Sequence, residues 1–531
     1  MQSASENLTL DQQIEQLVVV GFPATQPTPD LLDLIARDHV GGVILFSRNL
    51  GSPRQVFDLS RQLQQTAHAA GHAAPLLIMT DQENGLVRRL GDGFTALPGN
   101  MALGAVGDER TVCEVAQATA QEMLAVGVNM NLAPVADINN NPANPVIGVR
   151  SFGEDPAQVA RLSAAAVRGY QDAGLIATLK HFPGHGDTAV DSHRGLPVLR
   201  RTLDELRAVE LVPFIAGIQA GADCVMVGHL ALPDVTSDER PATLSPPLVQ
   251  GLLRRDLGFG GVVVSDCLEM DAIAKTVGTQ EGAVMALQAG IDLVLISHHH
   301  DVQRQALDRL RAAVRDGALS EEHVRVAADR VLRLKRRRLS WETALRSSMP
   351  DGIGGPQHGA LRDRAYARAI TLVRDDAALL PLRLAVHDRI LVVAQPPRAV
   401  TRAVDVPYDH RRFAQMMRRR HPNTEELALG PGDAAATSPA LQSALGVADV
   451  VVAVTINAHL DPQQADLLRV ALRSGRPVIG IAACDPYDAL AFTDLPTAIA
   501  TYEYTDPALE AAVAVLCGEA PAQGRLPVSL P

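Results

Sequence analysis

The chain has 531 residues, of which 47% are apolar and 20% charged, and its formal net charge is -12. This length and composition predict a folded protein of two or three domains and exclude a disordered chain. The acidic balance argues against a nucleic-acid partner, because it implies no broad basic surface.

The cysteines and the first residues indicate the compartment. The five cysteines are scattered and lack CxxC spacing, a pattern that is typical of reduced thiols rather than of a disulfide framework or a zinc site. The first 16 residues are polar and do not form the basic and apolar regions of a signal peptide. No apolar run reaches the roughly 18 residues that a membrane-spanning helix needs. We therefore expect a cytoplasmic enzyme without a membrane partner.

From the N-terminus, short apolar runs alternate with longer amphipathic stretches, several of which end in glycine as helices often do. The runs predicted as strands are residues 17–22, 43–46, 76–80, 130–136, 177–181, 224–228, 262–265 and 293–296. The clearest helical stretches are residues 53–71, 109–127, 156–174 and 203–221. Eight strand–helix units are the count of a (β/α)8 barrel, although a doubly wound sheet gives a similar alternation.

Polar residues end or directly follow six of the predicted strands: Asp81, Asp137, His181, His229, Asp266 and Ser297. A single polar residue at a strand end could simply mark where the strand reaches the protein surface. Six in succession favour the barrel, because the active site of a (β/α)8 barrel lies at the C-terminal ends of its strands.

A second α/β unit follows the predicted barrel. The alternation ends near residue 340, and a stretch rich in Gly, Pro and Ser predicts a linker over residues 341–360. Further strands are expected at residues 390–394, 450–455, 478–482 and 498–502, and a closing edge strand at 525–530. We therefore predict a barrel over residues 1–340 and a second domain over residues 361–531.

The densest group of titratable residues lies just after the fifth predicted strand. Between positions 180 and 193 the chain carries Lys180, His181, His185, Asp187, Asp191 and His193. Pro183, Gly184 and Gly186 prevent a regular helix there, so the stretch is expected to be a loop.

Three interpretations of this loop are open. It could bind a metal ion, although Pro183 and Gly184 prevent His181 and His185 from sharing a helical face as zinc ligands often do. It could be a structural loop whose histidines form only hydrogen bonds. It could also hold an acid/base pair, because Asp191 and His193 would share one face of an extended segment. A carboxylate bonded to one imidazole nitrogen lets the other exchange a proton near neutral pH.

Asp266 is the best candidate for a partner of this pair. It follows a run of three valines, so its carboxylate is expected to be held rigidly at the barrel mouth. A carboxylate nucleophile and a proton donor are the two catalytic groups of a retaining glycosidase. The alternative is that Asp266 is the N-cap of the next helix.

Another carboxylate pair, Asp81 and Glu83, follows the third strand. These two could hold sugar hydroxyls or form the catalytic couple of a substrate-assisted mechanism. The cations expected around the same rim are Arg88, Arg89, Arg150 and Lys180.

The run Lys180-His181-Phe182-Pro183-Gly184-His185-Gly186, followed after four residues by Asp191-Ser192-His193, resembles the signature of the β-N-acetylglucosaminidases of glycoside hydrolase family 3. The resemblance extends to Asp81-Gln82-Glu83 with Gly85 and Arg89, to residues 146–153, and to Ser265-Asp266 with Leu268 and Met270. It covers about the first 340 residues. Asn84-Gly85-Leu86 departs from the family pattern. Residues 474–478 and 524–528 resemble the family's C-terminal α/β sandwich domain.

The resemblance implies a role for each matching residue. Asp266 would be the nucleophile, His193 the general acid/base and Asp191 its partner. The N-acetylglucosamine (GlcNAc) unit would be bound by Asp81, Arg89, Arg150, Lys180 and His181. No cofactor or metal is implied. The implied substrate is a β-linked GlcNAc, notably on anhydromuramyl-peptide fragments in peptidoglycan recycling. In β-glucosidase relatives the C-terminal domain supplies an acidic catalyst, which the Asp191–His193 pair would make unnecessary.

Two other functions are compatible with this sequence. A phosphorylase would use phosphate in place of water on the same intermediate, and a muropeptide-binding sensor would bind without turnover. The sequence leaves open whether the chain is a monomer or a homodimer.

Overall fold

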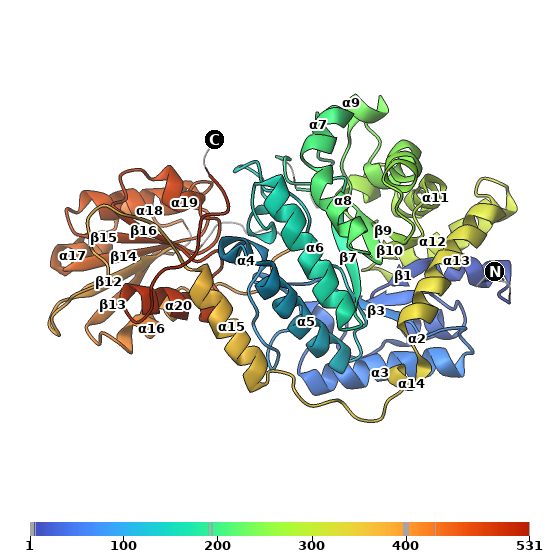
Figure 1. Ribbon diagram of the computed structural model, residues 1–531, viewed down its shortest axis with the longest axis horizontal. Coiled ribbons are helices and arrows are strands. Elements are labelled where there is room, and N and C mark those ends of the chain that lie inside the picture. Colours follow the sequence, from blue (N-terminus) through green and yellow to red (C-terminus); the bar gives the residue numbers. More distant parts are fainter. Residues whose placement is uncertain are drawn as a thin grey trace.

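The computed structural model describes residues 5, 7–189, 191–192, 195–396, 403–430 and 432–529. Figure 1 shows two units side by side, a barrel surrounded by helices and a sheet with helices on both faces. No helix of the described residues is long and apolar enough to cross a membrane.

The first unit is a closed barrel of eight parallel strands in the order β1-β10-β9-β8-β7-β6-β3-β2. The strands are β1 (Val18–Val20), β2 (Gly42–Ile44), β3 (Leu77–Thr80), β6 (Met130–Asn131), β7 (Ile176–Phe182), β8 (Cys224–Val227), β9 (Val262–Cys267) and β10 (Leu293–Ile296). Each coincides with a predicted strand. Their apolar side chains are buried on both faces because helices surround the barrel. The predicted barrel is confirmed.

Helices precede, connect and follow the barrel strands. They are α1 (Leu10–Glu15), α2 (Pro29–Ala36), α3 (Pro53–Ala69), α4 (Asn100–Val106), α5 (Glu109–Ala125), α6 (Pro156–Asp172), α7 (Leu203–Ala208), α8 (Leu211–Gln219), α9 (Pro233–Thr236), α10 (Asp271–Ala274), α11 (Thr279–Ala289), α12 (His300–Arg315) and α13 (Glu321–Arg338), with an irregular helical segment over Pro247–Asp256. The helix predicted over residues 203–221 is two helices, α7 and α8. Pro213 lacks the N–H that a continuous helix would use at that position, which favours the break.

A short antiparallel hairpin, β4 (Gln82–Asn84) and β5 (Val87–Arg88), follows β3. This hairpin lies between β3 and the next helix, α4, and places Glu83 and Arg89 beside the barrel mouth.

The second unit is a six-stranded sheet in the order β11-β16-β15-β14-β12-β13, in which only β11 runs antiparallel to its neighbour. The strands are β11 (Thr371–Asp375), β12 (Ile390–Ala394), β13 (Thr424–Ala428), β14 (Val450–Thr455), β15 (Val478–Ala482) and β16 (Thr497–Ala500). The helices are α15 (Pro356–Ala369), α16 (Arg411–Arg418), α17 (Pro439–Val447), α18 (Pro462–Arg473), α19 (Tyr487–Ala491) and α20 (Asp506–Leu516). One apolar core lies on each face of the sheet.

The prediction of an edge strand at residues 525–530 is wrong for the described part, up to Ser529, which contains no strand. This tail instead bonds to the barrel: the backbone N and Oγ of Ser529 donate to Glu154 at 2.8 and 2.7 Å. In the predicted linker, α14 (Trp341–Ala344) and the start of α15 are helical. The domain boundaries themselves stay predictions.

The two units make direct contacts near the barrel mouth. Asn139 lies 3.2 Å from the hydroxyl of Tyr487, and the backbone N of Gly99 donates to Glu503 at 3.0 Å. The second unit is therefore anchored to the loops that follow β3 and β6.

Candidate active site

Side chains that follow the barrel strands meet around one cavity of about 100 Å³. All five predicted substrate-binding residues and the predicted nucleophile line it, namely Asp81, Arg89, Arg150, Lys180, His181 and Asp266. Glu83, His185, Ser192, His298 and Ala403 also line it. Of the six strand-end residues, Asp81, His181 and Asp266 line the cavity, whereas Asp137, His229 and Ser297 are not among its lining residues. The role of each residue stays a prediction.

Glu83 is the centre of a buried charge network. Arg150 donates to its two oxygens at 2.9 and 2.8 Å, and the Nζ of Lys180 lies 2.6 Å from Oε1. Lys180 also donates to Asp81 Oδ1 at 2.7 Å. Burial alone would raise the pKa of Glu83, but Arg150 and Lys180 hold it below its usual range. Burial would likewise lower the pKa of Lys180, and the two carboxylates raise it instead. Glu83 and Lys180 therefore stay charged near neutral pH, and the network forms a rigid polar wall.

Arg89 connects the cavity to the second unit. Its Nη2 lies 3.7 Å from Asp81 Oδ2, and its Nη1 pairs with Asp405 and donates to the carbonyl of Ala403 at 3.0 Å. Asp405 also accepts a hydrogen bond from Ser47 at 2.5 Å. Sequence reasoning missed Asp405, which lies 316 positions from Arg89 and carries no local motif.

His181 is held between Asp137 and Arg150. Its Nδ1 lies 2.7 Å from Asp137 Oδ2, and its Nε2 lies 3.4 Å from Arg150 Nη2. Burial would raise the pKa of Asp137, but His181 and hydrogen bonds from backbone N–H groups lower it. Asp137 is thus a positioning residue beneath the cavity. His229, which follows the sixth strand, is fully buried and bonds to Thr243.

The loop after β7 is fixed by hydrogen bonds around His185. Its ring nitrogens lie 2.7 Å from Thr188 Oγ1 and 3.1 Å from Ser192 Oγ. Its backbone N donates to Asp137 at 2.7 Å, and Asn144 donates to its carbonyl at 2.9 Å. Burial lowers the pKa of His185 to about 4, so this imidazole is neutral at pH 7. For His185, the structural interpretation is the one that fits.

Of the predicted acid/base pair, the structure describes Asp191 but not His193. Asp191 is buried, immediately before the cavity-lining Ser192. His193 lies outside the described residues, so its pairing with Asp191 stays a prediction. Gly186 shows why the loop needs glycine, because a Cβ there would lie 1.6 Å from the carbonyl oxygen of Ile138.

Asp266 lies near the end of β9, half-buried, and faces the cavity. Its Oδ1 accepts a hydrogen bond from the backbone N of Cys267 at 2.7 Å. The N-cap alternative is wrong, because the next helix, α10, has Met270 as its N-cap. Glu269 is engaged elsewhere, since it accepts hydrogen bonds from the backbone N of Ser297 and of His298, both at 2.6 Å.

Among the described residues, no three His, Cys, Asp or Glu side chains are grouped so as to hold a metal ion. Asp187, in the loop after β7, pairs with Arg201 at 2.6 Å.

Comparison with known proteins identifies the family. Residues 9–334 match the model of the glycosyl hydrolase family 3 N-terminal domain. The chain belongs to glycosyl hydrolase family 3. This family 3 glycosidase is 31% identical to "Beta-hexosaminidase A" of Pseudoalteromonas piscicida, an alignment that covers 94% of this chain and 91% of that protein. It is 41% identical to "Beta-hexosaminidase" of Stenotrophomonas maltophilia (strain R551-3) over 53% of this chain and 83% of that protein.

Solved structures agree with this membership. A family 3 β-N-acetylglucosaminidase from Paenibacillus sp. str. FPU-7 superimposes with a TM-score of 0.91 at 41% identity, over 98% of this chain and 99% of that one. A fungal multi-domain family 3 β-N-acetylglucosaminidase gives a TM-score of 0.93 at 43% identity, and this glycosidase spans 61% of its length. A β-glucoside phosphorylase, at 22% identity and a TM-score of 0.81, shows the fold alone. The resemblance and the fold class predicted from the sequence are confirmed.

Proposed function

We propose that this family 3 glycosidase removes terminal β-linked GlcNAc from glycosides and retains the configuration at the anomeric carbon. The observation that carries the proposal is that Asp266 faces the same cavity as Asp81, Arg150 and Lys180. The similarity to β-hexosaminidases and β-N-acetylglucosaminidases supports the choice of sugar.

In the proposed reaction, Asp266 attacks the anomeric carbon while His193 donates a proton to the departing glycosidic oxygen. This step breaks the glycosidic bond and leaves a glycosyl ester on Asp266. His193 then accepts a proton from water, whose oxygen attacks the anomeric carbon and frees the aspartate. Asp191 would hold the imidazole in the required tautomer and stabilise its charged form.

The charge network would orient the sugar. Asp81 is the more accessible carboxylate, with 16% of its side chain exposed against 3% for Glu83, so Asp81 is the one able to accept hydrogen bonds from sugar hydroxyls. Both oxygens of Glu83 are engaged by Arg150 and Lys180. Glu83 is therefore a positioning residue, which argues against a substrate-assisted mechanism with Asp81 and Glu83 as the catalytic couple.

Sugar entry would require the cavity to widen. The cavity of about 100 Å³ is smaller than the roughly 300–1,000 Å³ of typical ligand pockets. Ser192 of the loop after β7 forms part of the cavity wall. We propose that the cavity wall opens to admit GlcNAc and closes over the bound sugar.

Peptidoglycan fragments in the cytoplasm are the proposed natural substrate. The sequence signature carries this part of the proposal. Comparing turnover of GlcNAc-anhydromuramyl peptides with that of chitobiose tests it.

The test of the reaction uses 4-nitrophenyl glycosides. We expect release of nitrophenol from the β-GlcNAc glycoside, much slower release from the β-glucoside, and the β-anomer as the first product seen by NMR. Asp266→Asn should lose nearly all turnover, and EDTA should leave turnover unchanged. Sugar 1-phosphate formed in phosphate buffer would indicate a phosphorylase, and absence of turnover on every glycoside would indicate a binding protein.

A further inference from the structure

Glu503 is a buried acid of the C-terminal unit that lies against the barrel and that the proposed reaction does not use. It follows β16 and is only 2% exposed. Its Oε1 accepts a hydrogen bond from the backbone N of Gly99 in the barrel at 3.0 Å. Its Oε2 accepts hydrogen bonds from the hydroxyl groups of Tyr366 and Thr505 at 3.0 and 3.1 Å. Both carboxyl oxygens are therefore engaged, and one of them bonds across the boundary between the two units.

The backbone directly before Glu503 has an uncommon conformation. Tyr502 has a φ of 65°, which few residues other than glycine adopt. Such a conformation persists where the surrounding structure fixes it, and the buried hydroxyl of Tyr502 lies 2.6 Å from Thr371 Oγ1. The position of Glu503 is thus set by this turn of the chain and by its own hydrogen bonds.

The residue after Gly99 holds the backbone of Arg150. Gly99 is the N-cap of α4, and Asn100 is the first residue of that helix. The side chain of Asn100 donates to the backbone carbonyl of Arg150 at 2.7 Å. Arg150 donates in turn to both oxygens of Glu83 and lines the catalytic cavity. A continuous path of bonds therefore joins Glu503 to the polar wall of the cavity.

Gly99 also packs against the β4–β5 hairpin, which carries Glu83. Gly85 in the turn of this hairpin has a φ of 58°, and a Cβ there would lie 2.9 Å from Gly99 Cα and 3.3 Å from Glu503 Oε1. The backbone N of Gly85 donates to the carbonyl of Leu97 at 3.1 Å. Because the turn is packed this closely, a shift of Gly99 would displace the hairpin as well.

We propose that Glu503 is a positioning residue, through which the C-terminal unit holds Arg150 in place for sugar binding. Glu503 acts on Arg150 through Gly99 and Asn100. The inference rests on the proposed function, because it requires that Arg150 bind the GlcNAc unit. It also gives the C-terminal unit a part in the reaction that does not depend on supplying a catalytic acid.

The charge of Glu503 is not needed for this role. Burial raises the pKa of Glu503 to about 7, so its neutral and charged forms coexist near neutral pH. In the neutral form Oε1 still accepts from Gly99, while the proton on Oε2 is donated to the hydroxyl oxygen of Tyr366 or Thr505. The length of the side chain, rather than its charge, is therefore what the contact with Gly99 requires.

The test separates length from charge with two substitutions. Glu503→Gln keeps an acceptor oxygen within reach of Gly99 and removes the charge. Glu503→Asp keeps the charge but is one methylene shorter, so it leaves the buried N–H of Gly99 without an acceptor. On 4-nitrophenyl β-GlcNAc we expect Glu503→Asp to raise KM roughly fivefold with a smaller fall in kcat, and Glu503→Gln to keep KM within about twofold. The Ki of free GlcNAc as a competitive inhibitor should change by the same factors.

A double-mutant cycle tests the path to Arg150. Asn100→Ala removes the side-chain donor to the carbonyl of Arg150 and should raise KM by itself. Because Glu503 acts through this same contact, the losses of Asn100→Ala and Glu503→Asp should not add.

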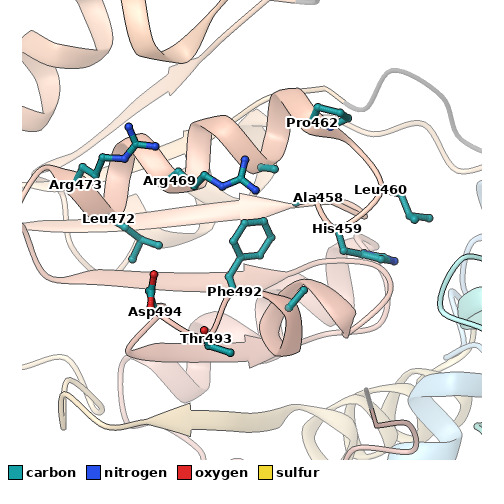
Figure 2. Close-up of a pocket in the computed structure, with 12 residues that line it drawn as sticks. Ala458, His459, Leu460, Pro462, Arg469, Leu472, Arg473, Phe492, Thr493 and Asp494 are labelled. Carbon is teal, nitrogen blue, oxygen red and sulfur yellow. The ribbon is translucent and has the colours of Figure 1, made fainter. Parts of the chain in front are cut away.

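Two variants of the C-terminal unit are the controls. Thr497→Val removes the hydrogen bond that the buried Thr497 donates to Asp375 at 2.7 Å, so it should lower the urea midpoint and keep KM. Arg473→Gln removes an exposed charge from the groove shown in Figure 2, and it should also keep KM. Among the described residues, this groove is lined by the C-terminal unit alone and shares no lining residue with the catalytic cavity.

A rise of KM in both Glu503 variants, in neither, or in Glu503→Gln alone would overturn the inference. Strictly additive losses in the cycle, or an equal rise of KM in Thr497→Val, would overturn it as well. If Glu503→Asp does not fold, Asn100→Ala decides alone, and an unchanged KM in that variant would overturn the inference. Failure of the proposed function would show differently, as absence of cleavage of 4-nitrophenyl β-GlcNAc by the unmodified enzyme.

Discussion

Asp405 is where the C-terminal unit reaches the catalytic cavity, and Asp405→Asn removes its charge while keeping its size. In the structure, Asp405 pairs with Arg89 and accepts a hydrogen bond from Ser47. With asparagine in this position, Arg89 would keep the carbonyl of Ala403 but lose its charged partner. Its guanidinium would then no longer be held near Asp81, so we expect sugar binding to weaken.

The expected size of the fall in kcat/KM follows from the burial of the Arg89–Asp405 pair. The side chains of Arg89 and Asp405 are 10% and 17% exposed, so water screens their interaction only in part. Hydrogen bonds to charged groups contribute about 1.5–3 kcal/mol, which we reduce to about 1–2 kcal/mol for the remaining exposure. This corresponds to a fall of roughly 5- to 30-fold in kcat/KM.

The assay is steady-state hydrolysis of 4-nitrophenyl β-GlcNAc, with kcat and KM determined separately. A positioning role predicts that KM rises more than kcat falls, and that Asp405→Glu restores part of the loss. Asp376→Asn, at an exposed carboxylate of the C-terminal unit, is the matched control. In a double-mutant cycle with Arg89→Ala, the two losses should not add.

An unchanged KM for Asp405→Asn would refute this reasoning. Strictly additive losses in the cycle would refute it as well, because they would show that Asp405 does not act through Arg89.

Three further changes test other parts of the structure. Glu83→Gln should lower the free energy of unfolding at pH 7 by roughly 3–5 kcal/mol, because Arg150 and Lys180 lose their buried partner. Since folding lowers the pKa of Glu83, the stabilisation by its carboxylate is complete above pH 4.5 and is lost only below that pH. Equal urea midpoints at pH 7 would contradict the prediction. Gly186→Ala should reduce kcat at least roughly tenfold by displacing the loop after β7, while Gly91→Ala, which has open space around it, should match the unmodified enzyme. Lys335 is fully buried, and burial lowers its pKa from 10.5 to about 7, so stability should rise by up to about 5 kcal/mol between those pH values. Lys335→Met should abolish that rise, and urea denaturation at pH 7 and 10 measures it.

The strands of the barrel were predictable because each is an apolar run buried on both sides. The edge strands of the sheet in the second unit could not be predicted in this way. Strand β13, Thr424–Ala428, reads Thr-Glu-Glu-Leu-Ala, which favours a helix, and its edge position lets Glu425 reach solvent. Strand β11, at the opposite edge, leaves Leu372 40% exposed. Residues 525–529 alternate like a strand, yet their last residue bonds to Glu154 of the barrel.

In the site, sequence reasoning placed Asp266 and Lys180 correctly because each lies near the C-terminal end of a barrel strand. It left open whether Asp81 and Glu83 hold sugar hydroxyls or form a catalytic couple, whereas the structure shows Glu83 paired with Arg150. Asp405 could not be predicted, because its contact with Arg89 depends on how two units far apart in sequence pack together.

The central claim is that Asp266 becomes covalently bonded to the sugar. Mass spectrometry of peptides after treatment with a slow fluorinated GlcNAc donor tests this most directly. We expect the peptide that contains Asp266 to gain the mass of the fluorinated sugar, and Asp266→Asn to gain none. A sugar attached to a different residue, or release of fluoride by the unmodified enzyme without any labelled peptide, would contradict it.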